Sequence, residues 1–78
     1  MKTVKISLNS IDKIRTFNDK VSKYEGVDFD LVSGRYVIDA KSIMGIFSLD
    51  LSKPVDLNIH TDDNTDAILE DIAAFVVK

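Results

Sequence analysis

The sequence contains no cysteine and no tryptophan, and it has only one proline, three glycines and one histidine. The lack of cysteine excludes disulfides, thiolate metal sites and cysteine nucleophiles. Acidic residues outnumber basic ones by 13 to 10, and the net charge of -3 argues against a nucleic-acid partner, which needs clustered lysine and arginine. No apolar run approaches a membrane span, and the opening residues MKTVKISL are too short and polar for a signal peptide. We therefore expect a cytoplasmic protein without nucleic-acid or membrane partners.

The chain length of 78 residues suits a single domain that spans residues 1–78. A domain of this size has room for one thin core, formed by one layer of helices on one sheet. The apolar share of 45% and the charged share of 29% are typical of a folded protein. A core this thin leaves little space for an enclosed cofactor, so we expect none.

Two kinds of apolar spacing divide the chain into secondary-structure elements. Alternation of apolar and polar residues predicts four strands, at residues 3–8, 27–31, 35–39 and 55–60. Apolar residues at every third or fourth position predict an amphipathic helix over residues 11–24, capped by Asn9 or Ser10. A second such helix is expected after Asn64, with one apolar stripe made of Ile68, Ile72, Phe75 and Val76.

The predicted order of elements is β-α-β-β-α-β-α, in which the middle helix is short. Ser33 and Gly34 form a turn signal between the second and third strands, which predicts a hairpin. The helix between the first two strands favours a right-handed crossover that places both strands in one sheet. Amphipathic helices and alternating strands together place the helices on one face of the sheet and water on the other. The sequence therefore predicts an α+β two-layer sandwich.

Residues 40–49, AKSIMGIFSL, are apolar almost without interruption behind a polar start. Ser42 has the chemistry of a helix N-cap, because its hydroxyl can accept a hydrogen bond from an amide of the first turn. A helix that is apolar all round is normally buried, but a single-sheet domain cannot easily surround it. We therefore expect an exposed partner-binding surface made of Ile43, Met44 and Phe47. The alternative is that this segment is ordinary core under a loop.

The segment AKSIMGIFSLDLSKP, residues 40–54, resembles the regulatory-serine region of the HPr family. These proteins are the small phosphocarriers of the bacterial sugar phosphotransferase system. SKYEGVDFDLVSGR, residues 22–35, and DNTDAILEDI, residues 63–72, are similar to the matching parts of that family, and the Lys-Ser-Ile-Met-Gly string is the most specific part. The resemblance implies an HPr-like open-faced β-sandwich, with a four-stranded antiparallel sheet and its helices on one face.

The resemblance also implies a regulatory role for Ser42. In the family, an ATP-dependent kinase phosphorylates the serine of this string, and a phosphate there would meet the amides of a helix N-terminus. The phosphate would also add nearly two negative charges beside the apolar side chains. In relatives from low-GC Gram-positive bacteria the phosphoserine form binds a catabolite-control transcription regulator. The implied partners are thus an HPr kinase/phosphorylase and such a regulator, and the simpler alternative is that Ser42 only caps the helix.

The defining chemistry of the family is absent from the matching segment. Family members carry the phosphoryl group on a histidine at the start of the first helix, with an arginine close behind. In SLNSIDKIRTF, residues 7–17, Ser10 takes the place of that histidine and Asp12 that of the arginine. An aspartate repels a phosphate, and a serine without a neighbouring base is a weak nucleophile. The single histidine, His60, ends the predicted fourth strand, and we expect it to face away from the core as a surface residue.

No metal site is expected in the chain. Asp62, Asp63 and Asp66 lack the spacing and the glycine of a calcium loop. We interpret these three aspartates as residues that cap the last helix.

The sequence therefore predicts a non-catalytic, HPr-like regulatory or docking protein related to the sugar phosphotransferase system, and not an enzyme. It is similar in this respect to the catabolite-repression variant of HPr, which also lacks the histidine. Phosphorylation of Ser42 would change which partner it binds. Two alternatives stay open: a phosphocarrier in sugar transport that works through an atypical site, and an interaction module that needs no phosphate.

Overall fold

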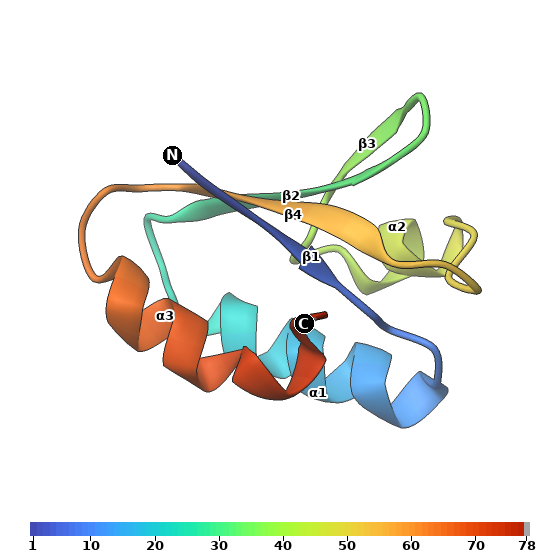
Figure 1. The fold of residues 1–78 in the computed structure, drawn as a ribbon, viewed down its shortest axis with the longest axis horizontal. Helices are drawn as coiled ribbons and strands as arrows, with labels where there is room; N and C mark the ends of the chain where they lie inside the picture. Colours follow the sequence, from blue (N-terminus) through green and yellow to red (C-terminus); the bar gives the residue numbers. More distant parts are fainter. Residues whose placement is uncertain (78) are drawn as a thin grey trace.

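The computed structural model describes residues 1–77 and contains four strands, three α-helices and one 3-10 turn (Figure 1). The elements in chain order are β1 (Lys2–Ile6), α1 (Ile11–Ser22), β2 (Asp28–Ser33), β3 (Tyr36–Asp39), α2 (Ile43–Phe47), β4 (Val55–His60), α3 (Thr65–Asp71) and η1 (Ala73–Phe75). This order confirms the predicted β-α-β-β-α-β-α arrangement.

The four strands form one antiparallel sheet with the order β1-β4-β2-β3. The strands β1 and β2 lie in the same sheet, as the helical connection predicted, and β4 separates them. In Figure 1, α1 and α3 lie together beneath the sheet, and no helix of the described chain lies above it. The α+β open-faced sandwich is therefore confirmed.

The core lies between the sheet and the helix layer, and it is entirely apolar among residues 1–77. Its largest fully buried side chains are Phe17, Phe29, Ile6, Leu8, Leu31, Ile46, Leu57, Ile59, Ile68, Ile72 and Val21. The ring of Phe17 on α1 meets that of Phe75 on η1 edge to face, with centroids 5.7 Å apart. Aromatic pairs favour this geometry, so the contact ties the two helical segments together.

The β2–β3 hairpin confirms the turn expected at Ser33 and Gly34. Ser33 pairs with Tyr36, which leaves a two-residue loop of Gly34 and Arg35. Gly34 has φ 59°, a left-handed conformation that glycine adopts without a steric penalty. A glycine with positive φ at the first loop position is typical of a hairpin turn whose twist matches the flanking strands.

The end of the chain differs from the single long helix that the apolar stripe predicted. The helix α3 ends at Asp71, and Val76 has an extended backbone that forms a bridge with Ile6 of β1. The amide of Ser7 donates to the carbonyl of Phe75 over 2.8 Å, and the amide of Val77 donates to the carbonyl of Lys5 over 2.9 Å. The unpaired backbone groups of an edge strand need hydrogen-bond partners, and residues 75–77 supply them. This segment therefore covers the C-terminal end of the outer edge of β1.

The capping role predicted for Asp62, Asp63 and Asp66 is wrong, because none of the three is the N-cap of α3. The N-cap residue is Asn64, whose backbone is left-handed and whose side chain makes no capping hydrogen bond. Asp62 instead accepts from the amino group of Met1 over 2.8 Å, and the amide of Asp63 donates to the Thr61 hydroxyl over 3.0 Å. A side-chain cap requires an extended backbone at the N-cap, which a left-handed Asn64 does not provide. Only Asp66, in the first turn, complements the helix dipole.

Candidate functional site

The start of α1 is capped by Ser10, at the position where the HPr resemblance places a histidine. Ser10 has an extended backbone, and its Oγ accepts a hydrogen bond from the amide of Lys13 over 3.2 Å. The following residues, Ile11 and Asp12, are both exposed. The segment therefore presents a hydroxyl, an apolar side chain and a carboxylate, and residues 7–12 contain no histidine, lysine or arginine.

The start of α2 is capped in the same way by Ser42, as predicted. Its Oγ accepts from the amide of Gly45 over 3.2 Å, and Ser48 closes the other end by donating from its Oγ to the Gly45 carbonyl over 2.6 Å. A Cβ atom at Gly45 would lie 3.2 Å from Ser42 Oγ and 3.3 Å from Ile38 Cδ1. Gly45 thus permits the close approach of α2 to β3.

The helix α2 has one buried side and one exposed side. Ile46 is fully buried, whereas Met44 is 77% exposed and Phe47 is 45% exposed. The exposure predicted for Met44 and Phe47 is therefore present in the structure. The same prediction is met only in part for Ile43, which is half-buried because it packs against the core.

An open depression of about 380 Å³ separates the start of α1 from α2 and the loop after it. It is lined by Leu8, Asn9, Ser10, Ile11, Ile14, Phe47, Leu51 and Ser52, none of which is charged. Met44 lies one helical turn before Phe47 and so on the same side of α2. We call the exposed group around this depression the α1–α2 surface, defined as Ser10, Ile11, Ser42, Met44 and Phe47.

Ile11 is the member of this surface that the sequence pattern missed. Its spacing from Ile14 and Phe17 assigns it to the buried stripe of the helix, but its side chain is 59% exposed. Helical spacing gives only the direction of a side chain, and it cannot show that nothing covers the first turn of α1. No signal in the sequence separates Ile11 from the two buried residues that follow it.

Hydrogen bonds between α1 and the segment before α2 hold the two sides of the depression together. The Asn18 side chain donates to the carbonyl of Lys41 over 2.8 Å and to that of Ala40 over 3.4 Å. The Lys41 ammonium group donates to the carbonyl of Tyr24 over 2.8 Å and lies 5.8 Å from the centroid of the Phe29 ring. These hydrogen bonds fix residues 40 and 41, and so the position of the following residue, Ser42, relative to α1.

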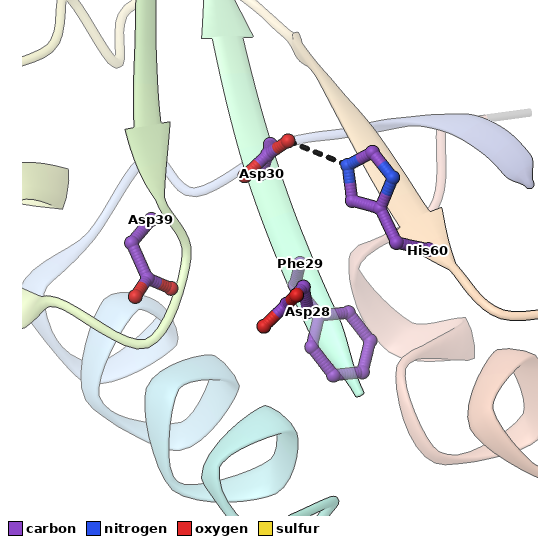
Figure 2. Close-up of a pocket in the computed structure, with 5 residues that line it drawn as sticks. All are labelled: Asp28, Phe29, Asp30, Asp39 and His60. Atoms are coloured by element: carbon purple, nitrogen blue, oxygen red, sulfur yellow. Dashed lines mark hydrogen bonds and ion pairs between the residues drawn. The ribbon is translucent and has the colours of Figure 1, made fainter. Parts of the chain in front are cut away.

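The single histidine lies elsewhere, on the open face of the sheet (Figure 2). His60 Nε2 donates to Asp30 Oδ2 over 2.5 Å. In the sheet register, Asp28 is directly opposite His60 and Asp39 is directly opposite Asp30. The predicted orientation of His60, away from the core, is confirmed. Three surrounding carboxylates would repel a phosphate, so this imidazole does not replace the one missing from the start of α1.

Two side chains near the helices have shifted pKa values. Asp50 accepts hydrogen bonds from the hydroxyl and the amide of Ser52, over 2.6 and 3.1 Å, and these bonds lower the pKa of Asp50. The Tyr24 hydroxyl donates to the carboxylate of Asp71, which raises the pKa of Tyr24. The first pair borders the depression, and the second joins the end of α1 to α3.

Residues 1–77 contain no group of three side chains placed to hold a metal ion. Within the same residues, no helix is long and apolar enough to cross a membrane.

Comparison with known proteins identifies relatives by structure and not by sequence. No protein-family model matches the chain, and no curated protein does. The structure is similar to that of HPr-C-His from Thermoanaerobacter tengcongensis, with a TM-score of 0.77 and 25% identity over 95% of this chain and 89% of that one. It is also similar to the phosphocarrier protein HPr from Bacillus anthracis str. Ames, with a TM-score of 0.74 and 25% identity over 97% of this chain and 94% of that one.

These two matches show that the chain has the HPr fold, and the resemblance inferred from residues 40–54 is confirmed at that level. The chain is thus an HPr-like protein, and both matches extend along nearly its whole length.

Proposed function

We propose that this chain is a non-catalytic regulatory or docking protein related to the sugar phosphotransferase system. Its working surface is the α1–α2 surface, and its switch is phosphorylation of Ser42 by an HPr kinase/phosphorylase. The phosphorylated form binds a protein partner such as a catabolite-control transcription regulator. No phosphoryl group passes through the start of α1.

The observation that carries this proposal is the exposure of three large apolar side chains, of which Ile11 and Phe47 line one uncharged depression and Met44 lies on the same side of α2 as Phe47. Ile11 is 59%, Met44 77% and Phe47 45% exposed. Clustered apolar exposure is costly for a small protein and marks surfaces that a partner covers. Ile43, which is half-buried, stands at the rim of this surface and contributes less contact area than Met44.

The position of Ser42 suits a switch for this surface. Ser42 is exposed, so a kinase can reach its hydroxyl, and a phosphate added there stays in contact with water. Ile43 and Met44 are the first two residues of α2, so their backbone amides have no acceptor within the helix. A phosphate adds a charge of about -1.5 to -2 next to apolar side chains, which favours a partner that offers arginine beside an apolar patch.

The chemistry at the start of α1 argues against a phosphoryl relay. Ser10 already accepts a hydrogen bond from the Lys13 amide, and no base neighbours it in the sequence segment 9–12. Asp12 adds a negative charge where a phosphoryl group would need a cation. A second proposal, a phosphocarrier with an atypical site, therefore has no residue to support it.

The test is the intact mass of the protein after incubation with ATP and an HPr kinase. We expect the wild type to gain one phosphoryl group and the Ser42→Ala variant to gain none. The matched control is Ser48→Ala, which removes a hydroxyl from the other end of α2 and should still be phosphorylated. A phosphoryl group on another residue, or none on the wild type, would contradict the role of Ser42.

A parallel incubation with phosphoenolpyruvate and the general enzyme of the phosphotransferase system tests the alternatives. We expect no acid-labile adduct, and such an adduct would restore the phosphocarrier interpretation. Binding of the regulator that is equal before and after kinase treatment would favour a module that works without phosphate.

A further inference from the structure

The two edge strands of the sheet, β1 and β3, differ in the backbone hydrogen bonds along their outer sides. Residues 75–77 cover the C-terminal end of the β1 edge with backbone hydrogen bonds. The strand β3 pairs only with β2 within residues 1–77, so its other edge has no strand beside it, and Figure 1 shows the hairpin extending away from the helix layer. An exposed edge strand can pair with another chain, and prolines, charged side chains, bulges or a very short strand limit such pairing. The strand β3 is short, with four residues, but it contains no proline and no lysine, and its one charged residue, Asp39, can pair with a cation.

The register of the hairpin shows which backbone groups point outward. The amide of Ala40 donates to the carbonyl of Phe29 over 2.8 Å, so this opposed pair is of the hydrogen-bonded type. Such pairs alternate along an antiparallel ladder, which makes Ile38 and Tyr36 face β2 in the same way. The amide and carbonyl of Val37, which lies between them, therefore point to the free edge, whereas the carbonyl of Asp39 accepts from the amide of Ser42 over 3.0 Å.

The side chains along this edge are self-complementary about Val37. Residues 35–39 read Arg-Tyr-Val-Ile-Asp, so an antiparallel copy centred on Val37 places Arg35 opposite Asp39 at both ends. Tyr36 then lies opposite Ile38, and Val37 lies opposite its own copy. Tyr36 is 71% exposed and Val37 is 62% exposed, which leaves both available for this contact.

The charges of both end residues are available for such a pairing. Arg35 forms no ion pair within residues 1–77. One carboxylate oxygen of Asp39 accepts from the amide of Lys41 over 2.9 Å, and the other has room for a guanidinium group. Asp39 also lies opposite Asp30 in the sheet, so an incoming cation meets a negative surface.

We propose that β3 is a homodimerisation edge, at which two copies of this chain join their sheets into one eight-stranded antiparallel sheet. Val37 exchanges amide and carbonyl hydrogen bonds with Val37 of the second copy, and two Arg35–Asp39 ion pairs flank them. The contact uses five residues a side, far fewer than the roughly 20–30 of a standard interface. The dimer is therefore weak and depends on protein concentration.

Sedimentation equilibrium of the wild type up to millimolar concentration tests this edge. We expect a reversible dimer, and Val37→Lys should abolish it because it places two like charges at the centre of the contact. Ala67→Lys makes the same charge change at an exposed position of α3 and should leave the dimer intact. A strictly monomeric wild type would overturn the proposal, as would a dimer that survives Val37→Lys.

A charge exchange tests the register independently. Arg35→Asp and Asp39→Arg should each weaken the dimer about tenfold, because each replaces two ion pairs by two like-charge contacts. An equimolar mixture of the two variants should regain the affinity of the wild type, since both ion pairs reform between unlike copies. Circular dichroism checks that each variant is folded, and if Asp39→Arg is not, Arg35→Asp and Val37→Lys decide. Two folded variants whose mixture stays monomeric would overturn the register.

Discussion

The α1–α2 surface and the acidic end of the open sheet face have opposite chemistry. The first is apolar, its depression has no charged lining residue, and serines cap both of its helices. The second holds the only histidine of the chain among three aspartates (Figure 2). The imidazole therefore lies where three carboxylates would repel a phosphate. The α1–α2 surface instead combines exposed apolar side chains with two capping serines.

This contrast shows that a side chain has to be judged with its surroundings. An imidazole can carry a phosphoryl group only where cations and amides neutralise the charge. At His60, a hydrogen bond to Asp30 already occupies one ring nitrogen. A hydroxyl such as that of Ser42, in contrast, needs only exposure and a kinase to become a charged group.

The largest expected effect separates the two sides of α2. Ile46→Ala should lower the free energy of unfolding by about 2–5 kcal/mol, because it opens a cavity in the core. Met44→Ala on the exposed side should change it by less than about 0.5 kcal/mol. Urea unfolding of the two variants measures both values. Comparable losses would mean that Met44 is structural, and the contrast between a docking side and a core side would fail.

The next largest effect is the loss of stability expected when Ser10 is replaced, because Ser10 serves as the N-cap of α1 and not as a nucleophile. Ser10→Ala should lower the free energy of unfolding by about 1 kcal/mol, because the Lys13 amide loses its acceptor. Ser10→Asp retains an acceptor and places a carboxylate at the positive end of the helix dipole, so it should restore stability. Thermal unfolding of the three proteins gives the ranking. A Ser10→Ala variant as stable as the wild type would remove the capping explanation.

On the open face we expect a smaller effect. His60→Ala should lower the free energy of unfolding by less than about 1 kcal/mol, because the paired side chains are each about a third exposed. The same variant should leave phosphorylation of Ser42 unchanged, since the two residues lie in different surfaces. His60→Gln, which keeps a hydrogen-bond donor, is the control for stability. A loss of kinase modification in either variant would break the separation of the two regions.

The smallest effect is a pH dependence at the border of the depression. The pKa of Asp50 is lowered in the folded protein, so its contribution to stability is present above the ordinary aspartate pKa of 3.8. It is lost as the pH falls through the lower folded-state pKa, where the carboxylate becomes protonated. Asp50→Asn should therefore flatten the acid side of a stability profile measured by urea unfolding, and Ser52→Ala should act in the same direction. An unchanged acid slope in both variants would contradict this pairing.

The sequence predicted the order of elements and the layer arrangement because both depend on local periodicity. Alternation at Val55, Leu57 and Ile59 and helical spacing at Ile14 and Phe17 hold in the structure. The end of the last helix was missed because Val76 follows the partners offered by β1 and not its own helical spacing. Such long-range hydrogen bonds leave no mark in a local pattern.

The candidate site was predicted in part for the same reason. The exposure of Met44 and Phe47 followed from a helix too apolar for a thin domain to bury. Ile11 was assigned to the wrong environment, and Ile43 is less exposed than predicted, because exposure depends on which other elements cover each side chain. The left-handed Asn64, which cancels the predicted side-chain cap, is likewise set by the path of the loop.

The most direct test is a nuclear magnetic resonance titration of the kinase-treated protein with a catabolite-control regulator. We predict that the largest chemical-shift changes fall on Ile11, Met44 and Phe47. Changes centred instead on Asp28, Asp39 and His60, with the α1–α2 surface unaffected, would contradict the assignment of the docking surface.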